Sequence, residues 1–136
     1  MKPKVIDLFA GVGGLSLGFE NSGFDVVLAN EYDPSIAAAY EENHRGTKMI
    51  CGDITSLDLE KTFSFYAGKV DVIIGGPPCQ GFSQKGQRKT IHDERNFLFK
   101  YFVKVVELVR PRYFVMENVP NLLTAEGGYF RKEIEE

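Results

Sequence analysis

The sequence offers little that would indicate a metal centre, a membrane protein or a general polyanion-binding protein. Its two cysteines, Cys51 and Cys79, lie in different contexts and form no CxxC or other metal-ligand spacing, so we expect no metal site. No hydrophobic run approaches the length of a membrane span, and the first residues lead straight into a predicted strand, so we expect neither membrane insertion nor a signal peptide. The net charge is −3, so any nucleic-acid contact must come from a local basic patch.

The composition of the sequence is that of one globular domain at most. Its 136 residues are 43% hydrophobic and 26% charged, which is enough to build a core and is unlike a disordered chain. Two isolated cysteines fit the reducing cytoplasm, and Cys51 is expected to be a core residue.

Short apolar segments alternate with helical patterns along the chain. Strands are predicted at 4–9, 25–29, 48–51, 70–74 and 113–116. Helices are predicted from the glycine-rich segment to residue 21, from Pro34 behind an Asp33 cap, from about Arg95 to Pro111, and from near Gly128. A short helix or loop is expected before residue 68, and the first helix is expected to turn Leu15, Leu17, Gly18 and Phe19 inward.

This alternation predicts an α/β fold, a doubly wound parallel sheet with strand order 3-2-1-4-5. In that order strands 1 and 4 are neighbours and strand 5 lies beside strand 4. The glycine loop after strand 1, Cys79 after strand 4 and Glu117 after strand 5 would then meet at one carboxyl edge.

The glycine loop and two carboxylates predict a nucleotide site at that edge. The loop, residues 9–14, follows strand 1, and Glu31 ends strand 2, where a carboxylate can accept hydrogen bonds from ribose hydroxyls. Asp53 ends strand 3 as an acceptor for an adenine amino group, with Ile54 packing on the ring. These features fit NAD as well as S-adenosylmethionine, but Ser16 stands where the dinucleotide pattern has a third glycine. A purely structural turn is the alternative.

The segment 75–83, GGPPCQGFS, predicts a positioned nucleophile. It follows a buried strand, and its two prolines fix two φ angles just before Cys79. A thiol on a stiffened turn suits nucleophilic catalysis, because part of it is thiolate at neutral pH even without assistance. The alternative is a small buried residue in a proline-rich turn. Glu117 raises a similar question, since a carboxylate after a buried strand either has a function or anchors a loop.

Taken together, these motifs resemble the cytosine carbon-5 methyltransferases. Asp-Leu-Phe-Ala-Gly, Asn-Glu-Tyr-Asp, Gly-Asp-Ile, Pro-Pro-Cys-Gln and Glu-Asn-Val occur in the order found in the amino-terminal half of a bacterial modification methyltransferase, between about Val5 and Asn121. The resemblance implies a Rossmann-like S-adenosylmethionine-dependent methyltransferase fold, incomplete at its carboxyl-terminal side.

The resemblance also implies roles for individual residues. Cys79 would be the nucleophile that attacks carbon 6 of cytosine, Glu117 the acid at N3, and Asn118 a further catalytic residue. The cofactor S-adenosyl-L-methionine would be bound by Phe9, Ala10, Gly11, Gly13, Gly14, Leu15, Glu31, Tyr32, Asp53, Ile54, Pro77 and Leu98. The partner would be double-stranded DNA with the target cytosine flipped out of the helix. Its contacts would come from Gln80, Ser83, Lys85 and Arg88 in the polar segment after the cysteine, for which a solvated surface loop is the alternative.

The chain departs from the family pattern at its carboxyl-terminal side. The family's Gln-x-Arg-x-Arg motif, target-recognition domain and final cofactor-contacting segment do not occur in residues 1–136. We therefore interpret 1–136 as the amino-terminal part of a catalytic domain, for which the remaining half or a second subunit is a candidate partner. The expected location is the bacterial cytoplasm, in association with the nucleoid. The alternatives are a tRNA cytosine-5 methyltransferase and a cofactor- and DNA-binding module without activity of its own.

Overall fold

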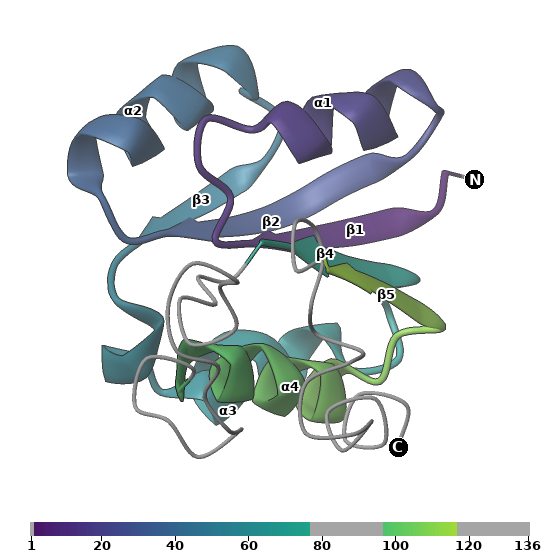
Figure 1. The fold of residues 1–136 in the computed structure, drawn as a ribbon. Coiled ribbons are helices and arrows are strands. Elements are labelled where there is room, and N and C mark those ends of the chain that lie inside the picture. The colour runs from purple at the N-terminus through teal and green to yellow at the C-terminus, as the bar shows by residue number, and fades with distance from the viewer. Residues whose placement is uncertain (1, 77–96, 117–136) are drawn as a thin grey trace, which may run out of the picture.

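A five-stranded parallel sheet occupies the centre of the structure, a computed structural model that describes residues 2–76 and 97–116 (Figure 1). Its strands are β1 (Lys4–Leu8), β2 (Asp25–Glu31), β3 (Lys48–Cys51), β4 (Val72–Gly75) and β5 (Tyr113–Met116). The order in the sheet is β3-β2-β1-β4-β5, and each neighbouring pair is parallel. The predicted fold class and strand order are confirmed.

Helices cover both faces of this sheet. Helices α1 (Gly14–Asn21) and α2 (Pro34–Asn43) lie on one face, and α3 (Leu59–Phe63) and α4 (Phe97–Val109) lie on the other (Figure 1). Two short 3₁₀ turns, η1 (Ile54–Ser56) and η2 (Ser64–Tyr66), flank α3. Among the helices of the described residues, none is long and apolar enough to cross a membrane.

The α3–α4 face is packed almost entirely with apolar side chains. Alternate residues of β1 point to this face, since successive side chains of a strand point to opposite sides. Its buried cluster consists of Ile6, Leu8, Leu28, Ile54, Phe63, Val70, Ile73, Phe102, Val105 and Val109. Burying side chains of this size contributes roughly 1.5–3 kcal/mol each, so this layer supplies much of the stability of the fold.

The α1–α2 face combines a smaller apolar cluster with buried polar groups. Its apolar part consists of Val5, Val26, Val72 and Ile74, with Leu15, Phe19 and Phe24 packed against them. Asp7 alternates with Ile6 and Leu8 along β1 and therefore faces α1 and α2, where it is 1% exposed. This face thus carries a buried carboxylate in the middle of the sheet.

Sequence signals that start and end a helix explain the position of α2. Asp33 is its N-cap, and its carboxylate accepts hydrogen bonds from the backbone N–H groups of Ser35 and Ile36. The pKa of the Asp33 carboxyl is lowered, first by the Ser35 side chain and then by these amides. Pro34 occupies the first turn, where its missing N–H costs nothing.

Two predictions about side chains were wrong. Leu17 is 52% exposed and Gly18 is exposed, because α1 turns Leu15, Ser16 and Phe19 towards the sheet instead. Cys51 is exposed rather than a core residue, because it is the last residue of β3, which forms an edge of the sheet described here.

The observed bounds differ slightly from the predicted ones. β1 ends at Leu8, β2 continues to Glu31, and β4 runs over Val72–Gly75. The short element predicted before residue 68 is η1, α3 and η2. The helix predicted near Gly128 lies outside the described residues, as does the segment from Pro77 to residue 96.

Candidate functional site

A loop with an unusual backbone connects β1 to α1. Phe9 and Gly11 have φ angles of 55° and 61°, and Gly13, the N-cap of α1, has a φ of 95°. The Ala10 N–H donates to the Asn30 carbonyl at 3.0 Å, which ties the loop to β2. Left-handed conformations of residues other than glycine are rare and concentrate at binding sites, so the strained Phe9 marks this loop as a candidate site.

Glu31, at the end of β2, holds the same loop from the other side. Its Oε1 accepts the Gly11 N–H at 2.8 Å, and its Oε2 accepts the Asp33 N–H at 3.0 Å. An ionised carboxylate has about four acceptor positions, so each oxygen can still accept a hydrogen bond from a ligand. Glu31 is therefore fixed in orientation while it keeps acceptor capacity.

Asp53 occupies the corresponding place after β3. Its Oδ1 accepts from the Thr55 N–H at 2.9 Å and from the Thr55 hydroxyl at 2.8 Å, which caps η1. Both hydrogen bonds that the structure describes for this carboxylate use Oδ1, which leaves the acceptor positions of Oδ2 for a ligand. Asn30, which is buried, joins the ends of β2 and β3 through its Nδ2 contacts with the carbonyls of Ile50 (2.7 Å) and Gly52 (3.1 Å).

These strand ends surround one cavity of about 510 Å³. Its lining comes from the ends of β1 to β4, from η1 and from the start of α4. The lining residues are Phe9, Asn30, Glu31, Tyr32, Gly52, Asp53, Ile54, Thr55, Gly76 and Leu98. Apolar side chains and two carboxylates thus share one chamber of the size that holds small ligands and cofactors.

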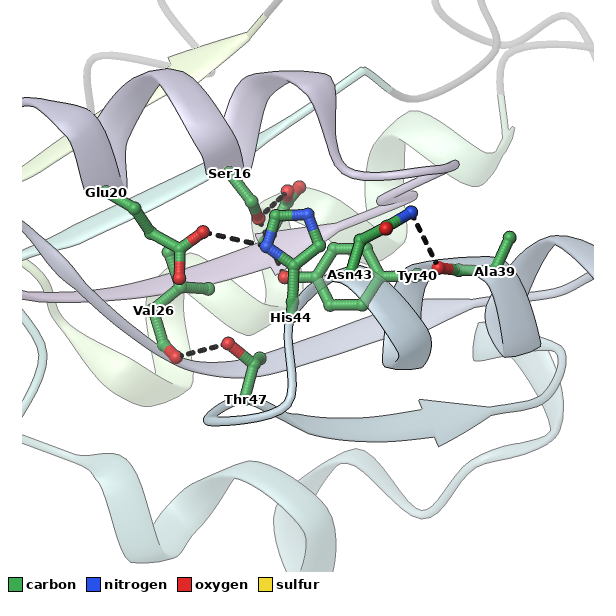
Figure 2. A network of polar contacts seen from close by, with 9 residues as sticks. Ser16, Glu20, Val26, Ala39, Tyr40, Asn43, His44 and Thr47 are labelled. Atoms are coloured by element: carbon green, nitrogen blue, oxygen red, sulfur yellow. Dashed lines mark hydrogen bonds and ion pairs between the residues drawn. The ribbon is translucent and has the colours of Figure 1, made fainter.

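A chain of polar side chains, most of them buried, connects residues of α1 with residues of α2 and the segment after it (Figure 2). Ser16 Oγ donates to Asp7 Oδ2 at 2.5 Å and lies 2.8 Å from the Tyr40 hydroxyl. His44 stacks on Tyr40 with ring centroids 4.3 Å apart, and its Nδ1 lies 2.7 Å from Glu20 Oε1. Burial raises the pKa of Tyr40 to about 12, so its hydroxyl remains a protonated donor near neutral pH.

Comparison with known proteins identifies the family. The family model described as C-5 cytosine-specific DNA methylase matches residues 3–136. The chain belongs to this family. Among the curated relatives it is 46% identical, over 100% of its own length, to the type II methyltransferase M1.HphI of Haemophilus parahaemolyticus. It is 44% identical, over 98% of its length, to the type II methyltransferase M.XorII of Xanthomonas oryzae.

Solved structures agree with this assignment. The chain matches a structure described as a DNA modification methyltransferase encoded within an E. coli prophage, with a TM-score of 0.76 and 37% identity over 98% of the chain. It also shares its fold with the Dnmt2 methyltransferase of S. pombe, with a TM-score of 0.70, 24% identity and 98% of the chain covered. The chain spans 37% of M1.HphI, 32% of M.XorII, 36% of the prophage protein and 40% of Dnmt2, so it corresponds to about a third of such proteins.

In this methylase-family chain, half of the cofactor-binding residues expected from the sequence line the cavity. These are Phe9, Glu31, Tyr32, Asp53, Ile54 and Leu98. Ala10, Gly11, Gly13 and Gly14 belong to the loop and to the first turn of α1 but not to the lining, and Leu15 packs against the apolar cluster on the α1–α2 face. The remaining residues singled out from the sequence lie outside the described residues. These are Pro77, the residues expected to be catalytic (Cys79, Glu117 and Asn118) and the residues expected to contact DNA (Gln80, Ser83, Lys85 and Arg88).

The sequence analysis missed four lining residues, Asn30, Gly52, Thr55 and Gly76. Thr55 had a usable signal, because a threonine two residues after an aspartate at a strand end commonly closes a capped turn. Asn30 had a weaker one, a polar residue within an otherwise apolar strand. The buried chain from Asp7 to His44 had none, because its members come from separate elements.

Proposed function

We propose that the protein containing this chain is an S-adenosylmethionine-dependent DNA (cytosine-5-)-methyltransferase of a restriction–modification system. The observation that carries this proposal is the composition of the cavity. Glu31 and Asp53 line it together with Gly76, and Gly76 directly precedes Pro77-Pro78-Cys79 in the sequence. One residue that lines this nucleotide-sized cavity is therefore close in sequence to Cys79, the proposed nucleophile.

The residues of the cavity fit the cofactor. The free acceptor positions on Glu31 match the two hydroxyls of a ribose, and Asp53 Oδ2 matches an adenine amino group. Phe9, Ile54 and Leu98 supply apolar surface for the adenine ring. When bound, S-adenosylmethionine supplies the methyl group.

Cys79 has the chemistry that the reaction requires. Carbon 5 of cytosine is a poor nucleophile while the ring is aromatic. Attack of the Cys79 thiolate on carbon 6 forms a C6–S bond and moves electron density towards N3, where a proton from Glu117 neutralises it. Carbon 5 is then electron-rich enough to accept a methyl group. A base or water then removes the carbon-5 proton, and the C–H electron pair forms the C5–C6 double bond as the C6–S bond breaks and the thiolate leaves. The proton on N3 returns to Glu117, which restores the neutral aromatic ring and the starting enzyme.

The proposed substrate is a cytosine in duplex DNA. A cytosine stacked in duplex DNA cannot reach Cys79, so the nucleotide is flipped out. The basic and polar side chains Gln80, Ser83, Lys85 and Arg88 follow the cysteine and are suited to phosphate contacts. The chain spans about a third of its relatives, and sequence recognition is assigned to the part of such proteins that residues 1–136 do not cover.

The relatives favour DNA over tRNA as the substrate. Those at 44–46% identity are named type II methyltransferases. The other alternative is a module that binds the cofactor and DNA but has no activity of its own. The test of the nucleophile distinguishes this alternative from the proposed function.

The nucleophile is tested with the full-length protein and a mechanism-based duplex. Bisulfite sequencing of DNA from cells that express the protein first identifies the methylated site. A duplex with 5-fluorocytosine at that site should then form a covalent adduct with wild type, because fluorine cannot leave as the proton does. We expect no adduct and no methyl transfer with Cys79→Ser, since a serine hydroxyl is scarcely ionised at neutral pH.

Cys51→Ser is the matched control for that experiment. Cys51 is an exposed thiol at the end of β3, and its replacement should leave both adduct and methylation at wild-type levels. An adduct that persists in Cys79→Ser would contradict the assignment of the nucleophile. A wild-type protein that methylates no DNA would contradict the proposed function itself.

A further inference from the structure

The buried polar chain on the α1–α2 face joins three elements that meet at the glycine loop. Asp7 belongs to β1, Ser16 to α1 and Tyr40 to α2, and these three residues are at most 1% exposed. Ser16 has one hydroxyl proton, which it donates to Asp7, so the Tyr40 hydroxyl must be the donor in its contact with Ser16. The hydrogen bonds therefore run in one direction, from Tyr40 through Ser16 to Asp7.

Such a chain fixes geometry more strictly than apolar packing does. Each buried polar atom must keep its partner, because an unpaired one is costly away from water. The pairing is satisfied only in one arrangement of α1 and α2 on β1. The start of α1, which is the end of the glycine loop, is thereby fixed in place.

Two rings, Tyr40 in α2 and His44 directly after α2, also contact the loop. A Cβ placed on Gly13 would overlap His44 Nε2 and would lie 2.8 Å from Tyr40 Cδ2, so the loop backbone packs tightly against both rings. Figure 2 shows His44 between Tyr40 and Glu20, with its Nδ1 directed to the Glu20 carboxylate. Glu20 thus sets the orientation of the imidazole that contacts Gly13.

The loop is held from two sides, and only one of these sides belongs to the cavity. Glu31 holds Gly11 from the cavity side, whereas Tyr40 and His44 hold Gly13 from the opposite side. Neither Tyr40 nor His44 lines the cavity. A change at Tyr40 therefore reaches a ligand through the protein backbone and not by direct contact.

We propose that Tyr40, acting through Ser16 and supported by His44, is a positioning residue that sets the conformation of the glycine loop for cofactor binding. The proposal rests on the proposed function, because it takes S-adenosylmethionine as the ligand of the cavity. It assigns to α2 a role in cofactor affinity although no side chain of that polar chain lines the cavity.

The test uses Tyr40→Phe in the full-length protein, which keeps the stacked ring and removes only the hydroxyl. We expect the dissociation constant for S-adenosylmethionine, measured by calorimetry, to rise about threefold to tenfold, the size of one lost hydrogen bond. The KM for the cofactor should rise with little change in kcat. Without any ligand, the backbone amides of Gly11 and Gly13 should exchange with deuterium faster than in wild type.

Ser16→Ala and Val109→Ala separate positioning from general destabilisation. Ser16→Ala interrupts the same chain, so the double variant Tyr40→Phe/Ser16→Ala should bind the cofactor no more weakly than Ser16→Ala alone. Val109 lies in the apolar cluster of the opposite face, and Val109→Ala should lower the unfolding midpoint without changing cofactor affinity or loop exchange.

Unchanged affinity and unchanged loop exchange in Tyr40→Phe would overturn the inference, as would additive losses in the double variant. If wild type fails to bind S-adenosylmethionine, the proposed function fails. The ligand-free exchange measurement still decides whether Tyr40 positions the loop.

Discussion

The two faces of the central sheet are built on different principles. On the α3–α4 face, large apolar side chains such as Phe63 and Phe102 pack into one cluster. On the α1–α2 face, hydrogen bonds among Asp7, Ser16 and Tyr40 pass through the layer. Apolar packing is non-directional and stabilises the fold, whereas hydrogen bonds are directional and fix the position of particular atoms. The α3–α4 face therefore contributes mainly to stability, whereas the α1–α2 face also fixes the geometry of the glycine loop.

The cavity lies at the carboxyl edge, where both faces contribute to it. Leu98 of α4 brings apolar surface from one face, and the glycine loop is held from the other. Substitutions on the α3–α4 face should therefore lower stability without changing cofactor affinity. Substitutions that disturb the glycine loop from the α1–α2 face should lower cofactor affinity.

The largest effect is expected from the apolar face. Phe63→Ala removes a fully buried ring and should lower the free energy of unfolding by about 3–5 kcal/mol, measured by denaturant titration. Under conditions where the variant is folded, its affinity for S-adenosylmethionine should match that of wild type. A loss of affinity as large as that of Tyr40→Phe would show that the two faces are not separable.

A smaller loss of stability, but a specific loss of affinity, is expected at Gly13. Gly13→Ala puts a side chain on a residue with a φ of 95° and forces it against His44 and Tyr40, which should cost about 1–3 kcal/mol of backbone strain. Calorimetry should show weaker binding of S-adenosylmethionine, because the loop must move.

Gly18→Ala is the matched control for Gly13→Ala. Gly18 lies on the exposed side of α1 with no neighbouring atom within 4 Å of an added Cβ. Alanine in a helix interior is favoured over glycine by about 1 kcal/mol, so this variant should be slightly more stable and should bind the cofactor normally. Equal binding by the Gly13 and Gly18 variants would contradict the role of the loop.

The order of the strands was predictable from the sequence because it depends on local patterns. Each strand is a short apolar run closed by a glycine, an acidic residue or a turn, and right-handed crossovers then leave few arrangements. Glu31 and Asp53 were predictable for the same reason, since both stand where a strand ends. Their entry into one cavity follows from the strand order.

The parts that depend on contacts between distant residues were not predictable. Leu17 was expected to be buried because it is apolar, but the buried position on α1 belongs to Ser16, which meets Asp7 and Tyr40. Cys51 was expected in the core, but as the final residue of an edge strand it is exposed. A serine at a buried helix position can be recognised only once the residues that form hydrogen bonds with its hydroxyl are known.

The most direct test of the central claim, that this cavity holds the ribose of S-adenosylmethionine through Glu31, is calorimetric titration of the full-length protein. Glu31→Ala removes acceptors for both ribose hydroxyls and the hydrogen bond to Gly11, so affinity should fall at least about tenfold. Glu42→Ala, an exposed carboxylate on α2, should bind as wild type does. Binding by Glu31→Ala that equals wild type would contradict the account, because the nucleotide would then lie elsewhere.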